Sequence, residues 1–253
     1  MTGASSGIGE ATARRLDADG WRTIVVARRG DRLEGLAGQL RDAHPLALDL
    51  TAEDAPARVR ERVEQEGALH LLVNNAGAAW RGRFAETGFE HVRRHMELNF
   101  DAAARLTEAL LPTLRRSAPS SIVNVSSTAA RVSRPKSGAY SVSKFALTAW
   151  TDSLHLEEKE HGVHVGMVLP GFIATEGFPQ RELRENARTR WLVSTPERVA
   201  EAILDAGPGG KPERYVPRIY WLAAAARVLA PGLIRRATGG GATTPATGAD
   251  ERD

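Results

Sequence analysis

Short apolar runs alternate along the chain with longer segments of helical periodicity. The apolar runs cover 23–27, 45–48, 69–73, 121–125 and 163–169. The helix-compatible segments cover 8–19, 31–42, 53–66, 87–117 and 139–160. Continuous apolar runs suit strands that are buried on both faces of a parallel sheet. Because strands and helices alternate, the pattern predicts right-handed βαβ units and a doubly wound, three-layer α/β/α fold.

The C-terminal part of the chain departs from this alternation. Residues 213–236 read as an apolar helical extension with flanking arginines, and residues 237–253 are rich in Gly, Thr and Ala. A segment with almost no large apolar residue cannot bury enough surface to order itself. We therefore expect one domain over 1–236, which includes the extension, and a disordered tail over 237–253.

Composition narrows the possible classes of protein. The 253 residues include no cysteine, which excludes a disulfide scaffold, a thiolate nucleophile and a thiolate metal site. Lys plus Arg number 34 and Asp plus Glu 31, and the arginines are interleaved with acids. That arrangement favours a solvated surface over a nucleic-acid stripe, so no nucleic-acid partner is expected. No run of 18 apolar residues is present, and we expect a cytoplasmic protein.

A glycine-rich segment opens the first predicted helix. Gly3, Gly7 and Gly9 have a Gly-x-x-x-Gly-x-Gly spacing, which allows close approach of a phosphate to a helix N-terminus. By itself this trio could equally be an ordinary glycine-rich turn. About 20 residues later, where an NAD site places an acid, the chain has Arg28 and Arg29. We interpret this as a preference for NADP(H), with surface charge as the alternative; the nearest acid, Asp31, is more simply a helix N-cap.

Further motifs follow in a fixed order. They are Asp49 after the second apolar run, Asn74-Asn75-Ala76-Gly77, Asn99, Ser127 placed 13 residues before Tyr140, Tyr140-x-x-x-Lys144, and Pro170-Gly171-Phe172-Ile173-Ala174-Thr175. Over residues 2–205 these motifs resemble the short-chain dehydrogenases/reductases of the compact, one-domain Tyr-x-x-x-Lys type. The resemblance implies a Rossmann-like fold and the catalytic residues Asn99, Ser127, Tyr140 and Lys144. It also implies that the cofactor is bound by Gly3, Ser5, Ser6, Gly7, Ile8, Gly9, Arg28, Arg29, Asp49, Leu50, Asn75, Ala76, Gly77, Tyr140, Lys144, Pro170, Gly171, Ile173 and Thr175.

The chemistry of the Tyr-x-x-x-Lys pair can also be argued from the residues. Tyr140 and Lys144 share a helix face, and a phenol with a pKa near 10 is a poor acid–base group at pH 7. A neighbouring ammonium and the charge of an oxidised nicotinamide would lower that pKa, so Tyr140 could exchange a proton with a carbonyl oxygen. Ser127 follows a strand, and its hydroxyl would polarise the carbonyl. By resemblance, Lys144 also binds the nicotinamide ribose, and Asn99 holds a water linked to Lys144.

These residues predict an NADP(H)-dependent oxidoreductase that interconverts a ketone or aldehyde and an alcohol. The alternatives are imine or alkene reduction on the same fold, or a non-catalytic NADP-sensing regulator. A small, apolar substrate is expected if Trp80, Phe172, Phe178 and Trp191 line a pocket, although core packing explains them equally well. His91 and His95 lie at i and i+4 without a third ligand, so we interpret them as a solvated face and expect no metal site.

Two expectations concern surfaces of the protein. Tyr220, Trp221 and the flanking arginines could form a helix that lies on a membrane surface. We favour the alternative, in which this helix covers the substrate pocket or packs on a partner subunit. The resemblance also implies a homodimer or homotetramer through 99–117 and 139–160.

A last expectation follows from the position of the glycine segment, which begins at residue 2. Such a loop should follow a strand of five to six residues, but only Met1 precedes Thr2. In the family's strand order that first strand is central, between the strands that contain Val25 and Val73. Its absence would leave buried backbone groups unpaired, which is costly. We therefore expect that the first strand is missing here and that the true chain starts upstream.

Overall fold

The computed structural model describes residues 1–176, 183, 185, 186 and 189–239. A four-stranded parallel sheet forms its centre, in the order β3 (Leu71–Asn74), β4 (Ser120–Val125), β5 (Val163–Pro170) and β8 (Glu213–Val216). A parallel pair, β1 (Thr23–Ala27) and β2 (Ala43–Ala47), continues the strand layer on the side of β3. A short parallel pair, β6 (Phe172–Ile173) and β7 (Val193–Ser194), follows β5.

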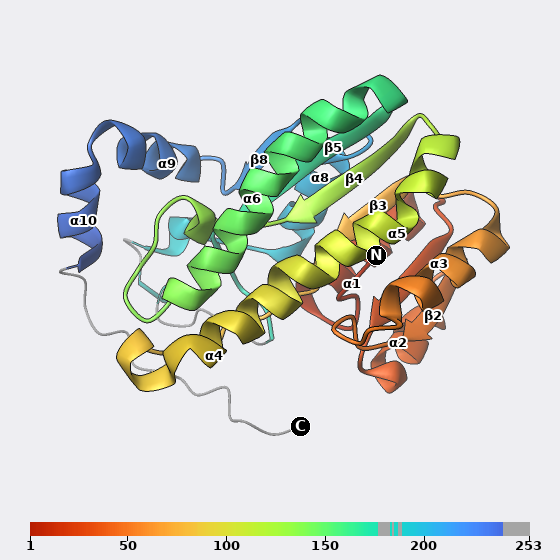
Figure 1. Cartoon of the computed structure of the whole chain (residues 1–253), viewed down its shortest axis with the longest axis horizontal. Coiled ribbons are helices and arrows are strands. Elements are labelled where there is room, and N and C mark those ends of the chain that lie inside the picture. Colours follow the sequence, from red (N-terminus) through yellow and green to blue (C-terminus); the bar gives the residue numbers. More distant parts are fainter. Residues whose placement is uncertain (177–182, 184, 187–188, 240–253) are drawn as a thin grey trace.

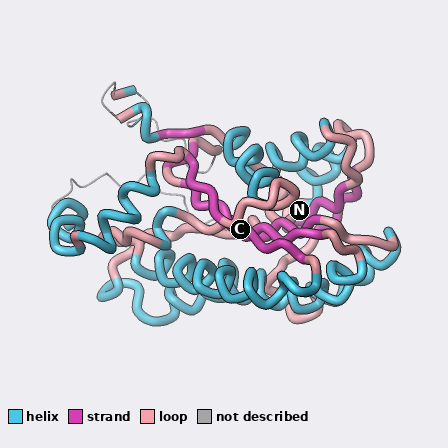
Figure 2. The backbone as a smooth tube through the Cα atoms, turned by 90° about the horizontal axis from the view of Figure 1, so that it is seen from above, coloured by secondary structure: helices cyan, strands magenta, loops and turns pink. Residues whose placement is uncertain are grey.

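Helices cover both faces of the strand layer, which gives the three layers seen in Figure 2. On one face lie α3 (Ala55–Glu66), α4 (Phe84–Met96), α5 (Ala102–Arg116) and α6 (Gly138–Glu158). On the other lie α1 (Gly7–Ala18), α2 (Gly30–Ala37) and α8 (Pro196–Ala206). Adjacent residues of β4 show why both faces are apolar: Ile122 belongs to the core under α5, whereas Val123 packs with α8. Strand β4 is therefore buried on both sides, as its apolar run predicts.

The predicted strands and helices are present, with shifts of a few residues at their ends. The longest predicted helix, 87–117, is in fact three pieces: α4, which is kinked at Gly88, a π-helical turn over Glu97–Asp101, and α5. Asp31 lies within the first turn of α2 rather than at its N-cap, which is Arg29, so the N-cap interpretation is wrong. Within the described residues, no helix is both long and apolar enough to span a bilayer.

The C-terminal extension differs from its prediction at both ends. Its first residues form strand β8, because they pair with β5, and helix begins only at α9 (Tyr220–Leu229). A second helix, α10 (Pro231–Gly239), continues into the segment expected to be a disordered tail, so that expectation is wrong for residues 237–239. Residues 240–253 lie outside the described part of the chain.

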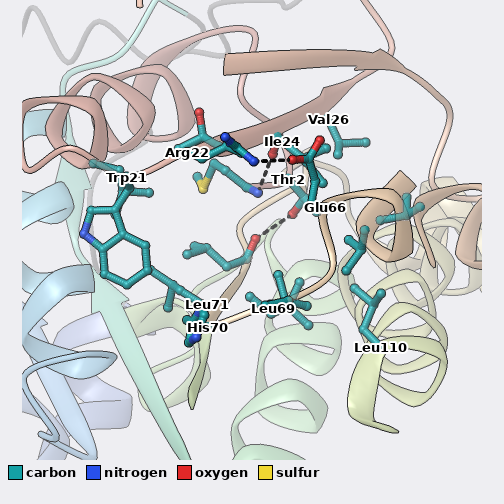
Figure 3. Close-up of a pocket in the computed structure, with 18 of the residues that line it drawn as sticks. Thr2, Trp21, Arg22, Ile24, Val26, Glu66, Leu69, His70, Leu71 and Leu110 are labelled. Carbon is teal, nitrogen blue, oxygen red and sulfur yellow. Dashed lines mark hydrogen bonds and ion pairs between the residues drawn. The ribbon is translucent and has the colours of Figure 1, made fainter. Parts of the chain in front are cut away.

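The strand layer is divided between β1 and β3. A cavity of about 590 Å³ lies there, lined by apolar side chains of β1, β3, α3 and α5 and by the Arg22–Glu66 ion pair (Figure 3). Residues 1–4 bridge the division at one end: Val26 N–H donates to Met1 O (2.9 Å) and Thr2 N–H to Val73 O (3.1 Å). The strands that contain Val25 and Val73 are thus neighbours without a paired strand between them among the described residues.

Candidate active site

The glycine segment is shaped by contacts that a side chain would prevent. Gly3 and Gly7 have φ values of +66° and +57°, which favour glycine. A Cβ at Gly3 would lie 2.8 Å from Asn75 Nδ2, and one at Gly9 would overlap the Gly3 carbonyl oxygen. The loop therefore folds tightly onto the start of α1 and leaves the first amides of that helix facing outward, which is the arrangement that holds a phosphate. Ile8 packs against the core beside α8 and anchors the helix.

The segment after β3 is fixed to this loop through Thr2. The Thr2 hydroxyl accepts from the amides of Asn75 (2.9 Å) and Ala76 (3.1 Å), and the Asn75 side chain donates to Thr2 O at 3.0 Å. A Cβ at Gly77 would lie 2.8 Å from Asn99 Oδ1. The carboxyl end of β3, the glycine loop and the π-helical turn are therefore in direct contact.

Arg29 lies over the glycine loop. Its guanidinium donates to Ser5 Oγ (2.9 Å) and Ser6 Oγ (2.7 Å), so it brings positive charge to the start of α1. Arg28 is exposed and lies near Asp49, which accepts from Thr51 N–H (3.0 Å). Burial opposes ionisation of Asp49, but the hydrogen bonds from Thr51 and the nearby Arg28 lower its pKa. Leu50 is buried beneath. Two arginines and two hydroxyls thus lie together beside the glycine loop.

Asn99 lies within the π-helical turn, an irregularity that is frequent at functional sites. Its amide nitrogen donates to Ala78 O and to Ser143 Oγ, both at 3.0 Å, and its Oδ1 accepts from Ala78 N–H at 2.9 Å. Asn99 therefore ties the loop after β3 to α6. Ser143 directly precedes Lys144 in α6, so this contact places Asn99 beside the residue next to Lys144.

Ser127, Tyr140 and Lys144 meet at the carboxyl ends of β4 and β5. Ser127 lies just after β4, and its Oγ donates to Pro170 O (3.4 Å) at the end of β5. A hydrogen bond joins the Ser127 and Tyr140 side chains. Lys144 Nζ donates to Val125 O (2.9 Å) and lies 6.0 Å from the centre of the Tyr140 ring. The structure therefore brings Ser127, which precedes Tyr140 by 13 residues, next to Tyr140 and Lys144.

Burial has the largest effect on the pKa values of Lys144 and Tyr140. It lowers the pKa of Lys144 to about 8, because an ammonium without water is destabilised. It also raises the pKa of Tyr140, and the hydrogen bond with Ser127 opposes that rise. In the protein without a cofactor the pKa of Tyr140 is therefore raised, and the expectation that Lys144 lowers it is wrong. The Lys144 ammonium is directed to Val125 O rather than to the phenol oxygen.

His95 lies beside Tyr140, whereas the sequence pattern predicts a solvated helix face for it. Its side chain is fully buried, its Nδ1 donates to His91 O (2.8 Å), and its Nε2 accepts from Trp80 N–H (3.2 Å). The ring centres of His95 and Tyr140 are 6.3 Å apart. The solvated-face interpretation is therefore wrong for His95. Its spacing of four residues from Asn99 places both on one side of the helix, a signal that could have indicated burial.

The described residues contain no group of three His, Asp or Glu side chains arranged to hold a metal ion. Burial lowers the pKa of His95, so it remains a neutral, hydrogen-bonded ring that supports the loop at Trp80.

Aromatic residues border the other side of the site. Phe172 follows Gly171, and its ring packs edge-on against Tyr220 at 6.4 Å between centres. The Arg134 guanidinium lies 4.6 Å over the Phe172 ring. A Cβ at Gly171 would overlap the Tyr220 ring, so α9 is seated closely against the segment after β5.

The segment after β5 contains further residues of the predicted site. Ile173 is buried, and Thr175 lies 3.2 Å from where a Gly7 Cβ would be. Trp191 is largely exposed, and Phe178 lies outside the described residues. The segment over 170–175 therefore connects the glycine loop to the aromatic side of the site.

Comparison with known proteins identifies the family. The sequence profile of the short chain dehydrogenases matches residues 1–186. The chain belongs to the short-chain dehydrogenase/reductase family. A solved short-chain dehydrogenase from Streptomyces avermitilis is 30% identical, with a TM-score of 0.76 over 96% of this chain and 98% of the other. Members of this family use nicotinamide cofactors and act as dehydrogenases or reductases.

Several members are similar along much of their length. The dehydrogenase/reductase SDR family member 7B of Bos taurus is 31% identical, over 93% of this chain and 78% of the bovine protein. An SDR family protein 7-like from Anopheles gambiae is 35% identical over 69% of this chain, which spans 58% of the mosquito protein. The oxidoreductase YbbO of Escherichia coli is 29% identical over 92% of this chain and 90% of that protein. The family and its Rossmann-like three-layer fold are therefore established for this chain.

Proposed function

We propose that this short-chain dehydrogenase/reductase interconverts a ketone or aldehyde and an alcohol with NADP(H), and that Tyr140 is its general acid and base. The observation that carries the proposal is the half-buried Tyr140, hydrogen-bonded to Ser127 and one helical turn from Lys144, whose ammonium lies 6.0 Å from the centre of its ring. A proton donor, a second hydroxyl and a cation around one point are what carbonyl reduction needs.

The glycine loop fits a dinucleotide. The positive φ of Gly3 and the lack of room for a Cβ at Gly3 and Gly9 leave backbone amides open at the start of α1. Arg29, held by Ser5 and Ser6, supplies the positive charge that a 2′-phosphate requires, which supports NADP(H) over NAD(H). When bound, the reduced nicotinamide supplies a hydride to the carbonyl carbon.

The side chains of this chain then handle the proton. Ser127 Oγ donates a hydrogen bond to the carbonyl oxygen in place of its bond to Pro170 O, and Tyr140 gives its proton to that oxygen. The ammonium of Lys144 stabilises the phenolate that remains, which counters the effect of burial on Tyr140. Asn99 keeps the loop after β3 and the helix of Tyr140 in register through Ala78 and Ser143. In the oxidative direction Tyr140 takes the proton back.

The Tyr140→Phe variant tests the proposal. We expect loss of NADPH-dependent reduction across a panel of ketones and aldehydes, with NADPH binding by fluorescence titration unchanged. The matched control is Tyr215→Phe, because Tyr215 bonds to Arg131 away from the site. Turnover retained in Tyr140→Phe would disprove the role of the phenol. Failure of wild type on every carbonyl, with NADP(H) bound, would favour an NADP-sensing regulator, and turnover of imines or activated alkenes alone would favour that related reductase.

The walls of the site support a small, apolar substrate. Trp80 lies on the side of His95, and Phe172 and Tyr220 lie on the side of β6, so aromatic surface is present on two sides. Apolar walls with a few polar groups are typical of small-molecule sites. A series of ketones of increasing chain length would measure this preference through kcat/KM.

We also propose a cytoplasmic homodimer or homotetramer. Helix α6 exposes Val142 and Phe145, and large apolar side chains at a helix surface favour burial against a partner. Sedimentation of the wild type and of a Phe145→Asp variant would show whether this helix forms the interface.

A further inference from the structure

Helices α9 and α10 project from the layered body of the molecule. In Figure 1 they lie beside one end of the sheet, and they pack on each other, while α9 also contacts the edge strand β8. Tyr220, the first residue of α9, is buried, and its hydroxyl donates to Leu192 O at 3.1 Å. The pair of helices is thus attached at its beginning, its middle part over 223–227 is half-buried, and Trp221, Leu222, Val228 and Leu229 are exposed.

The outer surface of α9 is apolar. Trp221, Leu222, Ala225, Val228 and Leu229 lie within an arc of about 120° on this helix, at 100° per residue. Val228 is 78% exposed and Leu229 is 84% exposed, and Leu233 of α10 is also exposed. A surface helix normally turns such a stripe toward the core. Here the body of the protein leaves it uncovered, so an apolar partner is needed.

The charge around this stripe has one sign. Residues 214–239 contain five arginines and no Asp or Glu. Arg214 forms an ion pair with Asp205 (2.7 Å), whereas Arg218, Arg227, Arg235 and Arg236 form none within the described structure. The face formed by α9 and α10, hereafter the C-terminal face, therefore combines exposed aliphatic side chains and a tryptophan with the guanidinium groups of Arg218, Arg235 and Arg236. Arg227 lies on the side of α9 opposite the stripe.

We propose that the C-terminal face binds the surface of an anionic lipid bilayer, with the apolar stripe of α9 inserted at the level of the headgroups. Basic residues beside an exposed apolar stripe that includes Trp are the features of a helix that lies in the membrane interface. The arginines would contact acidic headgroups, and tryptophan favours this depth. A second copy is a poorer occupant, because a two-fold interface places a surface against itself and would bring six like charges together.

The same contact places the site next to the bilayer. Tyr220 begins α9 and packs on Phe172 and Gly171, which border the proposed carbonyl site. Docking by the C-terminal face thus orients the aromatic side of the site toward lipid. Binding to the bilayer does not depend on the reaction, so it can be tested without turnover.

Flotation with vesicles tests the proposal. Wild-type protein should float with vesicles of 70% phosphatidylcholine and 30% phosphatidylserine, and bind pure phosphatidylcholine at least about tenfold more weakly. The Val228→Asp/Leu229→Asp variant should lose about tenfold or more in binding, because both side chains are exposed and their replacement leaves the fold intact. The control is Leu156→Asp near the far end of α6, which removes an equally exposed apolar side chain and should bind as wild type.

A charge series separates lipid from protein partners. Arg235→Gln/Arg236→Gln should weaken binding to the acidic vesicles severalfold, whereas Arg58→Gln/Arg60→Gln on α3 should not. Emission from Trp221 should shift to the blue with vesicles and be quenched by brominated lipid, and Trp221→Phe should lose that signal. Lack of flotation of the wild type, or equal flotation of Val228→Asp/Leu229→Asp, would overturn the proposal. A change from dimer to monomer in that variant, without lipid binding by the wild type, would assign the face to a protein interface.

Discussion

The ammonium of Lys144 donates to the carbonyl oxygen of Val125 at 2.9 Å, in a position almost closed to solvent. The described structure gives it no carboxylate, so its charge is stabilised by the end of β4 alone. This geometry orients the cation beside Tyr140, and its burial is unfavourable for folding.

Replacement of Lys144 by Met should therefore separate stability from activity. We expect loss of carbonyl reduction together with a gain of up to about 3 kcal/mol in the free energy of unfolding at pH 7, since the pKa shift from 10.5 to about 8 reflects a penalty of that order. Urea unfolding measures the gain. A variant less stable than wild type at pH 7 would contradict it.

The same shift predicts a dependence on pH. Between about pH 8 and 10.5 the folded protein has released the Lys144 proton and the unfolded chain has kept it, so the stability of the wild type rises with pH in this window. The advantage of Lys144→Met should shrink over that range. Reductive kcat/KM should fall above about pH 8, because the cation that stabilises the Tyr140 phenolate is lost.

Gly77→Ala should impair the site without altering the fold. The new Cβ would lie 2.8 Å from Asn99 Oδ1 and 3.5 Å from Lys144 Nζ, so the Asn99 amide must move. We expect kcat to fall by about tenfold or more, since small displacements at a site are costly. Gly35→Ala on α2 is the control, because nothing lies within 4 Å of its Cβ. Equal kcat in the two variants would show that Asn99 tolerates the shift.

Arg29→Gln should change the choice of cofactor. Loss of the guanidinium over Ser5 and Ser6 should raise KM for NADPH by about tenfold or more and leave KM for NADH nearly unchanged, as a charge-assisted contact to phosphate is lost. Arg14→Gln, on the outer side of α1, is the matched control. If wild type uses NADH and NADPH equally, the role of Arg29 is disproved.

His95→Phe should loosen the loop at Trp80. The variant removes the acceptor of the Trp80 amide, and an unpaired buried donor costs about 1–3 kcal/mol. We expect a lower melting temperature and a raised KM for the carbonyl, with KM for NADPH unchanged. His161→Phe, at an exposed position, should melt as wild type.

Most strands and helices were predictable because the residues within each short segment specify the element that it forms. The apolar runs at β1, β4 and β5 specify buried strands, and the spacing of Tyr140 and Lys144 specifies a shared helix face. Burial by distant elements was not predictable. His95 has the charged neighbours of a surface helix, and the loop at Trp80 and Tyr140 of α6 bury it. Likewise β8 lacks a long apolar run, and its pairing with β5 makes it a strand. The direction in which Lys144 points depends on Val125, a contact that motif spacing does not contain.

The division of the strand layer between β1 and β3 separates the molecule into two parts that we expect to differ in local stability. One part holds β1, β2 and α2 with the proposed adenosine side of the site, and the other holds β3 to β8 with Tyr140. The glycine loop and residues 1–4 join them across the cavity. Such an arrangement favours two units that unfold separately. In amide hydrogen exchange, we expect β1 and β2 to open at a lower free energy than β4 and β5. A dinucleotide that touches both parts would couple the two openings, so ligand protection should be greatest in the strands farthest from the chemistry.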